Sequence, residues 1–274
     1  MNDDRTIRQV TLDAEVTKTP LRITETGKHS RVEVTVQHGI SATIFDTSIS
    51  DQHELHATLA SESELHIISL STCSARKFTS HLADGAKIFW HCFTLGDTPA
   101  PHSLVSTCTG AHATSDIDWI FSVREKERQT VTVRNIFAAN NGGGEITLKG
   151  VAQQNGFAVC NGMIEITEEG TGTDTYLTED VLMLDATAKV DAIPGLEIRT
   201  NDVKASHSAT VSRVTVEDLF YFQSRGIDSE TARRMYTEGF LGDLTERILD
   251  DEIHAQVRDA FVGYYSDGGL YSNA

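Results

Sequence analysis

The chain has 274 residues, with 40 acidic and 23 basic side chains and a formal net charge of −17 at pH 7. This length suits one large domain, or one large domain with a small one appended. Nucleic acids and anionic membrane surfaces bind clustered Lys and Arg, so the composition argues against both partners, and no apolar run approaches the about 18 residues of a membrane span. Residues 1–6 contain no apolar segment, and we therefore expect no signal peptide.

Short apolar segments rich in β-branched residues follow one another up to about residue 211. The first contains Val32, Val34 and Val36 in alternation with polar residues, the period of two that is typical of a strand. Similar segments follow at 65–68, 88–90, 119–121, 131–133, 146–148, 164–166, 181–184 and 196–198. Turn-forming residues separate several of them, at 140–144, 161–162, 170–172 and 194–195.

The spacing of these strands indicates the fold class. From residue 132 onward the strand centres recur about every 14 to 18 residues, and no helix-length segment of 3.6-residue period lies between them. A βαβ arrangement needs longer, helical connections, so regular strand–turn units predict a β-solenoid in which each coil stacks on the next. A β-sandwich built from short hairpins is the alternative.

The period changes at Thr215. Thr215 followed by Asp218 resembles a capping box, with Asp in the position usually held by Glu, and predicts the start of a short helix. Gly226 stands where a residue in the left-handed conformation would end this helix.

Two further helices are expected before the C-terminus. Asp228 or Ser229 can cap the second helix, which we expect to end at Gly239. The third is predicted over residues 243–264, where apolar residues recur every three to five positions and form one stripe. Three short helices bury little surface by themselves, so we expect them to pack on the β body or on a partner.

The four cysteines do not form a recognisable site. They are Cys73, Cys92, Cys108 and Cys160, and no two of them make a Cys-x-x-Cys pair. Dispersed thiols suit a reducing, cytoplasmic location better than a disulfide framework. Each is expected to be buried as a small apolar side chain, and Cys92 is the first exception to consider because His91 adjoins it.

Two other motifs resemble active-site signatures without matching them. His53 and His56 are separated by three positions rather than the four of a helical zinc motif, and we expect them on a solvated face. The glycine run at 142–144 lacks the Lys-Ser or Lys-Thr of a phosphate-binding loop and is interpreted as a flexible turn. The absence of a self-sufficient active site favours a scaffold or binding role over an independent enzyme.

His207 is the candidate site residue. It lies between Ser206 and Ser208, shortly after the last clear strand segment and before the helices. One interpretation is a hydrogen-bonded surface histidine. The other is a ligand to a soft metal or cluster, because a neutral imidazole binds iron. One histidine does not make a site, so further ligands would have to come from elsewhere in the chain or from another chain.

Residues 130–245 resemble the SufB/SufD family of scaffold proteins for iron–sulfur cluster assembly. The segments that carry the resemblance, in order, are CNGMIEI (160–166), GTDTYLT (172–178), VLML (181–184), DAIPGLEI (191–198), DVK (202–204), SHSAT (206–210), EDLFY (217–221) and SRGI (224–227). The resemblance implies a right-handed parallel β-helix with a C-terminal α-helical domain. It also implies that two such subunits pair along their β-helices, that each helical domain docks a SufC-like ABC-type ATPase, and that a nascent cluster forms at the subunit interface.

The cluster residue of SufD-type members corresponds to His207, where Ser-His-Ser-Ala-Thr stands for Ser-His-Gly-Ala-Thr. Two thiols of the family are absent. Ala188 stands six residues before Pro194, where some SufB-type scaffolds have an essential cysteine, and Ala205 stands where SufD-type proteins often have one. The chain therefore resembles the SufD type more closely, with a shortened N-terminal region.

These observations divide the chain into an N-terminal segment (1–30), a β-helix core (31–213) and a C-terminal helical domain that docks an ATPase (214–274). The resemblance makes His207 the expected metal ligand of a transient iron–sulfur cluster shared with a second SufB/SufD-type subunit. No catalytic residue is expected, because ATP hydrolysis belongs to the ATPase. The expected partner-binding residues, for which packing inside the helical domain is the alternative role, are Leu219, Phe220, Tyr221, Arg225 and Gly226. Some family complexes use a flavin, but no flavin motif is visible here.

Two other functions stay open at this point. A β-solenoid enzyme acting on polysaccharide would need a cleft lined by acidic groups on neighbouring coils. A structural paralogue would bind the ATPase without a cluster. The sequence does not distinguish a homodimer from a heterodimer.

Overall fold

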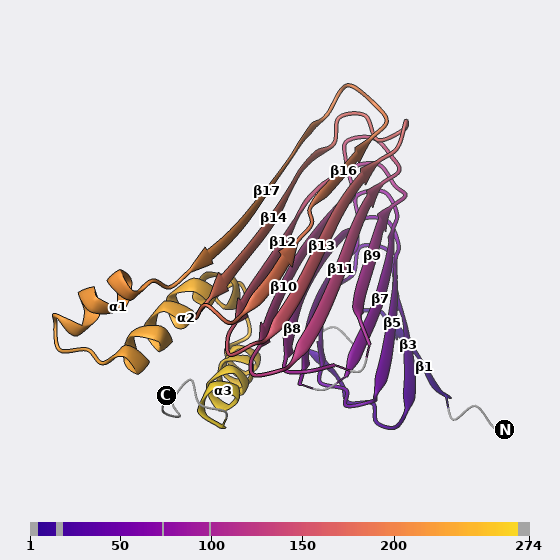
Figure 1. Ribbon diagram of the computed structural model, residues 1–274. Coiled ribbons are helices and arrows are strands. Elements are labelled where there is room, and N and C mark those ends of the chain that lie inside the picture. Colours follow the sequence, from indigo (N-terminus) through magenta and orange to yellow (C-terminus); the bar gives the residue numbers. More distant parts are fainter. Residues whose placement is uncertain (1–4, 15–18, 73, 99, 268–274) are drawn as a thin grey trace.

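In the computed structural model, which describes residues 5–14, 19–72, 74–98 and 100–267, the strands form a parallel β-solenoid of about seven turns followed by three helices (Figure 1). The solenoid predicted from the strand spacing is confirmed. Consecutive strands up to residue 192 alternate between two sheets, and each pairing between the described strands is parallel. A sandwich of hairpins would need antiparallel neighbours, so that alternative is wrong.

The two sheets contain alternate strands of the chain. Sheet A is formed, in spatial order, by β1 (Arg5–Leu12), β3 (His29–Val36), β5 (Gln52–Leu59), β7 (Ala75–Leu82), β9 (His102–Cys108), β11 (Arg128–Phe137) and β13 (Phe157–Ile166), with β15 (Lys189–Ala192) and β16 (Gly195–Ile198) both paired to β13. Sheet B is formed by β2 (Leu21–Ile23), β4 (Ser41–Asp46), β6 (Glu64–Ser71), β8 (Lys87–Leu95), β10 (Thr114–Val123), β12 (Gly143–Ala152), β14 (Asp174–Met183) and β17 (Lys204–Arg213).

The coils lengthen along the chain. The neighbouring residues Asp46 and Ser69 are 23 positions apart, whereas Asp116 and Glu145 on later coils are 29 apart. Since each coil contributes one strand to each sheet, consecutive strands recur after roughly half a coil, which explains the spacing seen in the sequence.

Alternating burial within each strand builds the core between the two sheets. Every second side chain points inward. In β11, for example, the buried residues alternate with residues that are half-buried or exposed, and the buried ones face the interior. Aromatic rings stack along the interior, with the ring centre of Phe78 lying 5.1 Å from Trp90 and 6.1 Å from Trp119. Each such ring buried from water contributes roughly 1.5 to 3 kcal/mol, so the interior of the solenoid is the main source of its stability.

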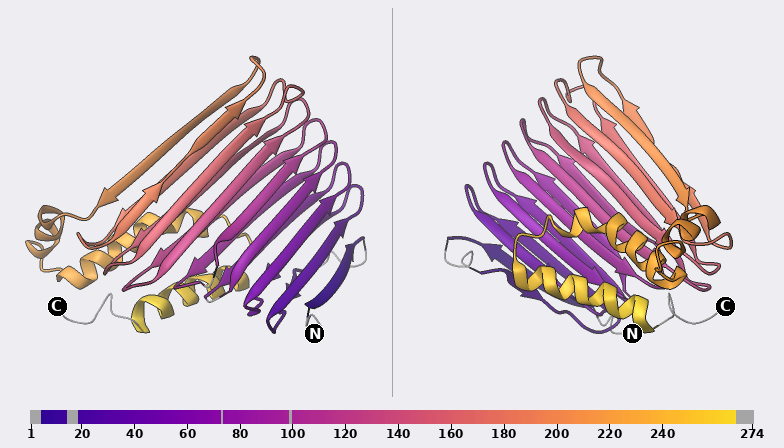
Figure 2. Two further views of the ribbon diagram at one scale, coloured as in Figure 1. Left: turned by 45° about the vertical axis from the view of Figure 1, so that its right-hand side comes forward. Right: turned by 90° about the vertical axis from the view of Figure 1, so that its left-hand side faces the viewer.

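The three helices are α1 (Val216–Gln223), α2 (Ser229–Thr245) and α3 (Asp251–Asp267). Helices α2 and α3 lie across the outer face of sheet B, where they contact β8, β10 and β12 (Figure 2). They cover a second apolar cluster, formed by outward side chains of sheet B and side chains of both helices. The capping box predicted at Thr215 and Asp218 is confirmed, and Gly226 has the expected positive φ of 81°.

The predicted boundary between the second and third helices is wrong. Gly239 lies inside α2, which continues to Thr245, and α3 begins only at Asp251. One glycine in a helix costs only about 1 kcal/mol, and burial of Leu241 and Leu244 against sheet B outweighs it. The actual start signal is Asp250, whose side chain accepts a hydrogen bond from the backbone N–H of Ile253 at 2.9 Å.

The glycine run at 142–144 is only partly a turn. Gly143 and Gly144 begin β12, and Gly144 has a φ of 127°. A Cβ at Gly144 would lie 2.1 Å from the carbonyl oxygen of Ser115 on the preceding coil. The interpretation as a flexible turn is therefore wrong for these two strand residues, and Gly144 allows close contact between coils.

The last strand ends at Arg213 and the first helix begins at Val216, while β1 and β2, within the first 30 residues, already pair with β3 and β4. The division of the chain into three domains stays a prediction.

Candidate functional site

His207 lies in the middle of β17, the terminal strand of sheet B. It pairs in register with Leu177 of β14, a fully buried residue of the interior. In-register residues of parallel strands point to the same side, so His207 lies on the inward-facing side of its strand. No further described strand stacks on β17, and the side chain of His207 is exposed at this end of the solenoid.

The last coil is an open end of the solenoid. One edge of β17 pairs with β14, whereas the other edge has no partner among the described strands. Apolar side chains at this end are also exposed, namely Ile193, Ile198 and Val211. A ten-residue strand edge with exposed apolar neighbours is the kind of surface that pairs with another chain.

The two positions without the family's thiols belong to this same coil. Ala188 is buried just before β15, and Ala205 on β17 packs against the interior. Among the residues that the structure describes, no group of three or more His, Cys, Asp or Glu side chains could hold a metal ion. Within the described ranges, His207 is therefore not part of a metal site with three or more such side chains.

A thiol and a carboxyl group meet inside the solenoid one coil below β17. Cys160 of β13 donates to Glu179 Oε2 at 3.8 Å, and the backbone N–H of Gly162 donates to Glu179 Oε1 at 2.6 Å. Glu179 is 0% exposed. Burial raises the pKa of Glu179 to about 7, even though both hydrogen bonds act in the opposite direction. Burial and the neighbouring Glu179 raise the pKa of the Cys160 thiol.

Sequence reasoning missed Glu179, although a signal was present. Thr175, Leu177, Glu179 and Val181 alternate with outward-facing residues, so the period of two already placed this glutamate among inward positions. An acidic residue at an inward position indicates a buried carboxyl group.

The other described cysteines are buried as predicted. Cys92 and Cys108 lie in the interior, and burial raises the pKa of the Cys108 thiol to about 12 and that of Cys92 well above its usual value. Cys92 and His91 point to opposite sides of β8, so they form no pair. Cys73 lies outside the described residues.

His53 is not on a solvated face, and that prediction is wrong. It is fully buried, with Nδ1 2.7 Å from Ser30 Oγ and Nε2 3.4 Å from Asp46 Oδ2. Arg76 Nη1 lies 3.7 Å from the same carboxyl oxygen. Burial would raise the pKa of Asp46, but Arg76, His53 and hydrogen bonds from Ser48 hold it below its usual value. This group joins successive coils where the chain passes from sheet B to sheet A.

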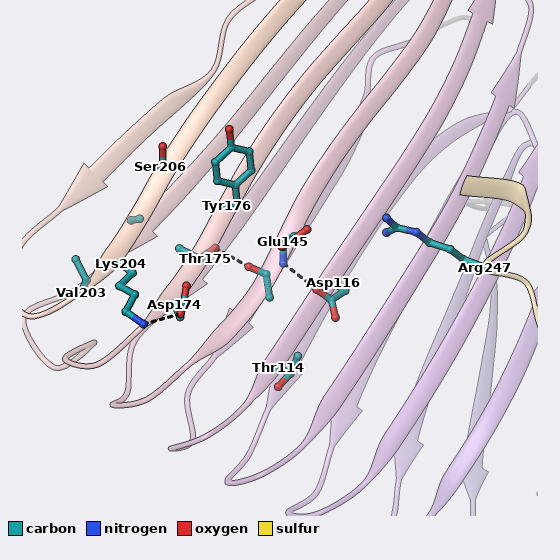
Figure 3. A pocket seen from close by; sticks show the side chains of 12 residues that line it. Thr114, Asp116, Glu145, Asp174, Thr175, Tyr176, Val203, Lys204, Ser206 and Arg247 are labelled. Atoms are coloured by element: carbon teal, nitrogen blue, oxygen red, sulfur yellow. Dashed lines mark hydrogen bonds and ion pairs between the residues drawn. The ribbon is translucent and has the colours of Figure 1, made fainter. Parts of the chain in front are cut away.

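A polar groove of about 1020 Å³ lies on the part of sheet B that the helices leave uncovered (Figure 3). Asp116, Glu145 and Tyr176 line it from neighbouring strands, and Arg247 reaches toward it from the α2–α3 connection. Burial and the nearby carboxylates of Asp118 and Glu145 raise the pKa of Asp116. The groove thus has acidic groups on neighbouring coils, which the polysaccharide alternative requires.

An ionic contact ties the helices to sheet B beside this groove. Arg247 Nη1 donates to Asp118 Oδ1 at 3.0 Å, and the other carboxyl oxygen of Asp118 lies 3.1 Å from His91 Nδ1. Asp118 and His91 are buried, whereas Arg247 is half exposed. A movement of the helical layer that displaces Arg247 would therefore change the contacts of Asp118 on β10 and His91 on β8.

Helix α1 stands apart from the solenoid and packs on α2, at the end of the molecule opposite β1 (Figure 1). Phe220 is 67% exposed and Tyr221 53% exposed, and the Arg225 guanidinium stacks 4.4 Å from the centre of the Tyr221 ring. Leu219 instead packs toward the helical cluster, and Gly226 forms the turn after α1. His207 lies within β17 and these residues lie beyond its end, so the two predicted sites are separate.

Residues 18–240 match the family described as "SUF system FeS cluster assembly, SufBD core domain". The iron–sulfur cluster assembly protein SufD of Escherichia coli (strain K12) is 29% identical over 255 residues, covering 88% of this chain and 60% of that protein. An iron–sulfur cluster assembly SufBD family protein of Mycobacterium bovis is 29% identical over 140 residues, which cover 51% of this chain and 16% of that protein. Protein ABCI7, chloroplastic, of Arabidopsis thaliana is 37% identical over 113 residues, which cover 41% of this chain and 24% of that protein.

The chain spans 60% or less of the length of each of these relatives. None of its helices, within the residues described, is long and apolar enough to cross a membrane. The match over residues 18–240 covers most of the chain and includes the coil that carries His207. The resemblance seen in the sequence is thereby confirmed, and the chain belongs to the SufBD core-domain family of the SUF system for iron–sulfur cluster assembly.

Proposed function

We propose that this chain is a scaffold subunit on which a nascent iron–sulfur cluster forms, between its last coil and a second SufB/SufD-type subunit. A SufC-like ATPase docks on its helical domain and performs the nucleotide chemistry, so this chain contributes no catalytic residue. The iron–sulfur cluster is the cargo of the assembly, and His207 is its ligand from this side of the interface.

The observation that carries the proposal is the position of His207 on the unpaired edge strand. The residue is exposed, on the inward side of β17, at the open end of the solenoid. A second subunit that pairs with this edge would cover the exposed strand and bring its own ligands close to the imidazole. An imidazole buried within one coil could not be shared in this way.

The groove on sheet B does not lead us to propose a carbohydrate-active function. Its acidic residues are either exposed to solvent or already hydrogen-bonded within the chain. The carboxylate of Asp116, for example, accepts a hydrogen bond from the backbone N–H of Glu145 at 2.8 Å. Membership of the SufBD family supports a role in cluster assembly instead.

The ligand role of His207 is tested by anaerobic reconstitution of the complete complex with iron and sulfide. His207→Ala should lower the iron and sulfide content of the complex at least several-fold, because no other described imidazole lies on the edge strand. His81→Ala is the matched control, since His81 is exposed in the middle of sheet A and away from the last coil. Full iron and sulfide content in the His207 variant would refute the ligand role. A complex that holds the ATPase but never iron would identify the structural paralogue.

The docking role of α1 is tested by binding of a purified SufC-like ATPase. Replacing both Phe220 and Tyr221 by Ser should weaken binding roughly 10- to 100-fold, because exposed aromatic side chains dominate the energetics of interfaces. The control is Leu249→Ser, since Leu249 is 86% exposed in the α2–α3 connection. Unchanged affinity in the aromatic double variant, measured by calorimetry, would reassign α1 to packing alone.

A further inference from the structure

The interior of the solenoid holds, next to the last coil, a thiol and a carboxyl group that the proposed function does not use. We infer that Cys160, with Glu179 as its base, supplies a thiolate ligand for the iron that His207 binds when the last coil opens. The inference rests on the proposed scaffold function and identifies a second ligand of the same site. It places the soft ligand one coil deeper than Ala188 and Ala205, the positions where thiols are absent.

The register of the strands brings the three groups to one end of the interior. His207 lies over Leu177, and Glu179 is two residues further along β14, which makes it the diagonal neighbour of His207 on the inward side. Strands lie about 4.8 Å apart and two strand residues span about 6.6 Å, so the Cα atoms of His207 and Glu179 are about 8 Å apart, within reach of long side chains. Cys160 already touches Glu179 from the opposite sheet.

The chemistry requires a base at the thiol, and Glu179 is in place. When Fe²⁺ binds, the S–H bond of Cys160 breaks, the proton passes to Glu179 Oε2, and an iron–sulfur bond forms. Iron and sulfur keep their oxidation states, so no oxidant or reductant is needed. Thiolate is the ligand that iron–sulfur clusters prefer, and imidazole is the second type of ligand found for them.

Access requires movement of the last coil, whose part of sheet A is divided into two short strands. Here β15 and β16 each pair with β13 over only four residues, whereas β11 pairs with β13 over ten. The cover is made of small side chains, since Cys160 is paired with Ala192 and Glu179 with Ala209. Displacement of β15, which lies over Cys160, would expose the thiol and leave β17, with His207, paired to β14 over ten residues.

The test uses the full-length, metal-free chain under anaerobic conditions, with Co²⁺ alone as the probe. A thiolate ligand gives an intense charge-transfer absorption in the near ultraviolet. We expect this band in the wild type and in Cys108→Ser, whose thiol is buried elsewhere in the interior, and no band in Cys160→Ser. Glu179→Gln should weaken Co²⁺ binding by about 10- to 100-fold, in line with the loss of a group that supports a metal ligand.

Mass spectrometry after alkylation provides a readout that needs no variant. Co²⁺ should protect Cys160 of the wild type from iodoacetamide and leave Cys108 unaffected. The inference is overturned if the wild type shows no thiolate band, or if the band and the protection persist without Cys160. A different result would refute the scaffold function instead: the isolated chain shows a Co²⁺ band that depends on Cys160, but the complete complex never binds iron. Iron loading that depends on His207 but is indifferent to Cys160 would refute this inference alone.

Discussion

Replacing Arg76 by Met should lower the free energy of unfolding by about 3 to 5 kcal/mol, because it leaves a buried carboxylate without its cation. Arg76 is 1% exposed and Asp46 is 0% exposed. Arg76 Nη2 also donates to the backbone carbonyls of Ser48 at 2.8 Å and Leu70 at 3.0 Å, and Met can make neither bond. The loss should appear in urea or thermal unfolding at pH 8, where a neutral His53 does not replace the missing charge.

The neighbouring residue provides the control. Lys77 is on the same strand, but its side chain is 62% exposed and lies 3.6 Å from Glu54. Lys77→Met should change the stability by less than about 1 kcal/mol, since exposed ion pairs contribute little. Combining Arg76→Met with Asp46→Asn removes both buried charges and should recover most of the loss. If the double variant is as unstable as Arg76→Met alone, the ion pair is not the cause of the effect.

Replacing Glu179 by Gln should stabilise the metal-free protein by about 3 kcal/mol at pH 8 and by almost nothing below pH 4.5. The pKa of Glu179 is raised from 4.5 to about 7 in the folded chain. As pH rises above 4.5 the unfolded chain loses this proton first, and the folded state becomes progressively less stable until the pH passes about 7. Gln has no proton to lose in this range, and its amide oxygen can still accept the N–H of Gly162.

The measurement is the difference in unfolding free energy between wild type and variant from pH 4 to pH 8, in which the titration of all other groups cancels. Asp185→Asn is a control of opposite sign. Burial would raise the pKa of Asp185, but hydrogen bonds from Thr187 and Gln154 outweigh it and lower the pKa. That substitution should therefore destabilise the protein at neutral pH, and the cost should stay nearly constant from pH 4 to pH 8, because the lowered pKa of Asp185 lies below this range. A wild-type–Glu179→Gln difference that is independent of pH would show that Glu179 keeps an ordinary pKa.

Much of the fold could be predicted from local pattern. Alternation at Val32, Val34 and Val36 and its later repeats mark strands whose inward residues are buried on one side. The capping box at Thr215 marked the change to helix because its two hydrogen bonds involve residues only three apart. The third helix was misplaced because a glycine within a helix and one that ends it look alike in sequence, and packing against sheet B decides between them.

The candidate site was predictable only in part. His207 was found through its sequence context, but its exposure depends on β17 being the last strand of the stack. The sequence predicts a solvated face for His53 because its spacing to His56 does not match a zinc motif and the flanking pattern is not clearly helical. Asp46 and Arg76, which lie beside it in the interior and pair with each other, come from the adjacent sheet and the next coil.

The amino-acid sequence alone was enough to predict a solenoid followed by helices. The signals used, namely period-two alternation, strand spacing and helix caps, depend on residues that are close together in the chain. Contacts between coils join residues such as Cys160 and Glu179 or Asp46 and Arg76, and which side chains meet follows from the stacking register and the coil length. Pairing of charges, the raised pKa of Glu179 and the open last coil therefore emerge only when the coils are stacked, because burial and proximity across coils are properties of the assembled solenoid.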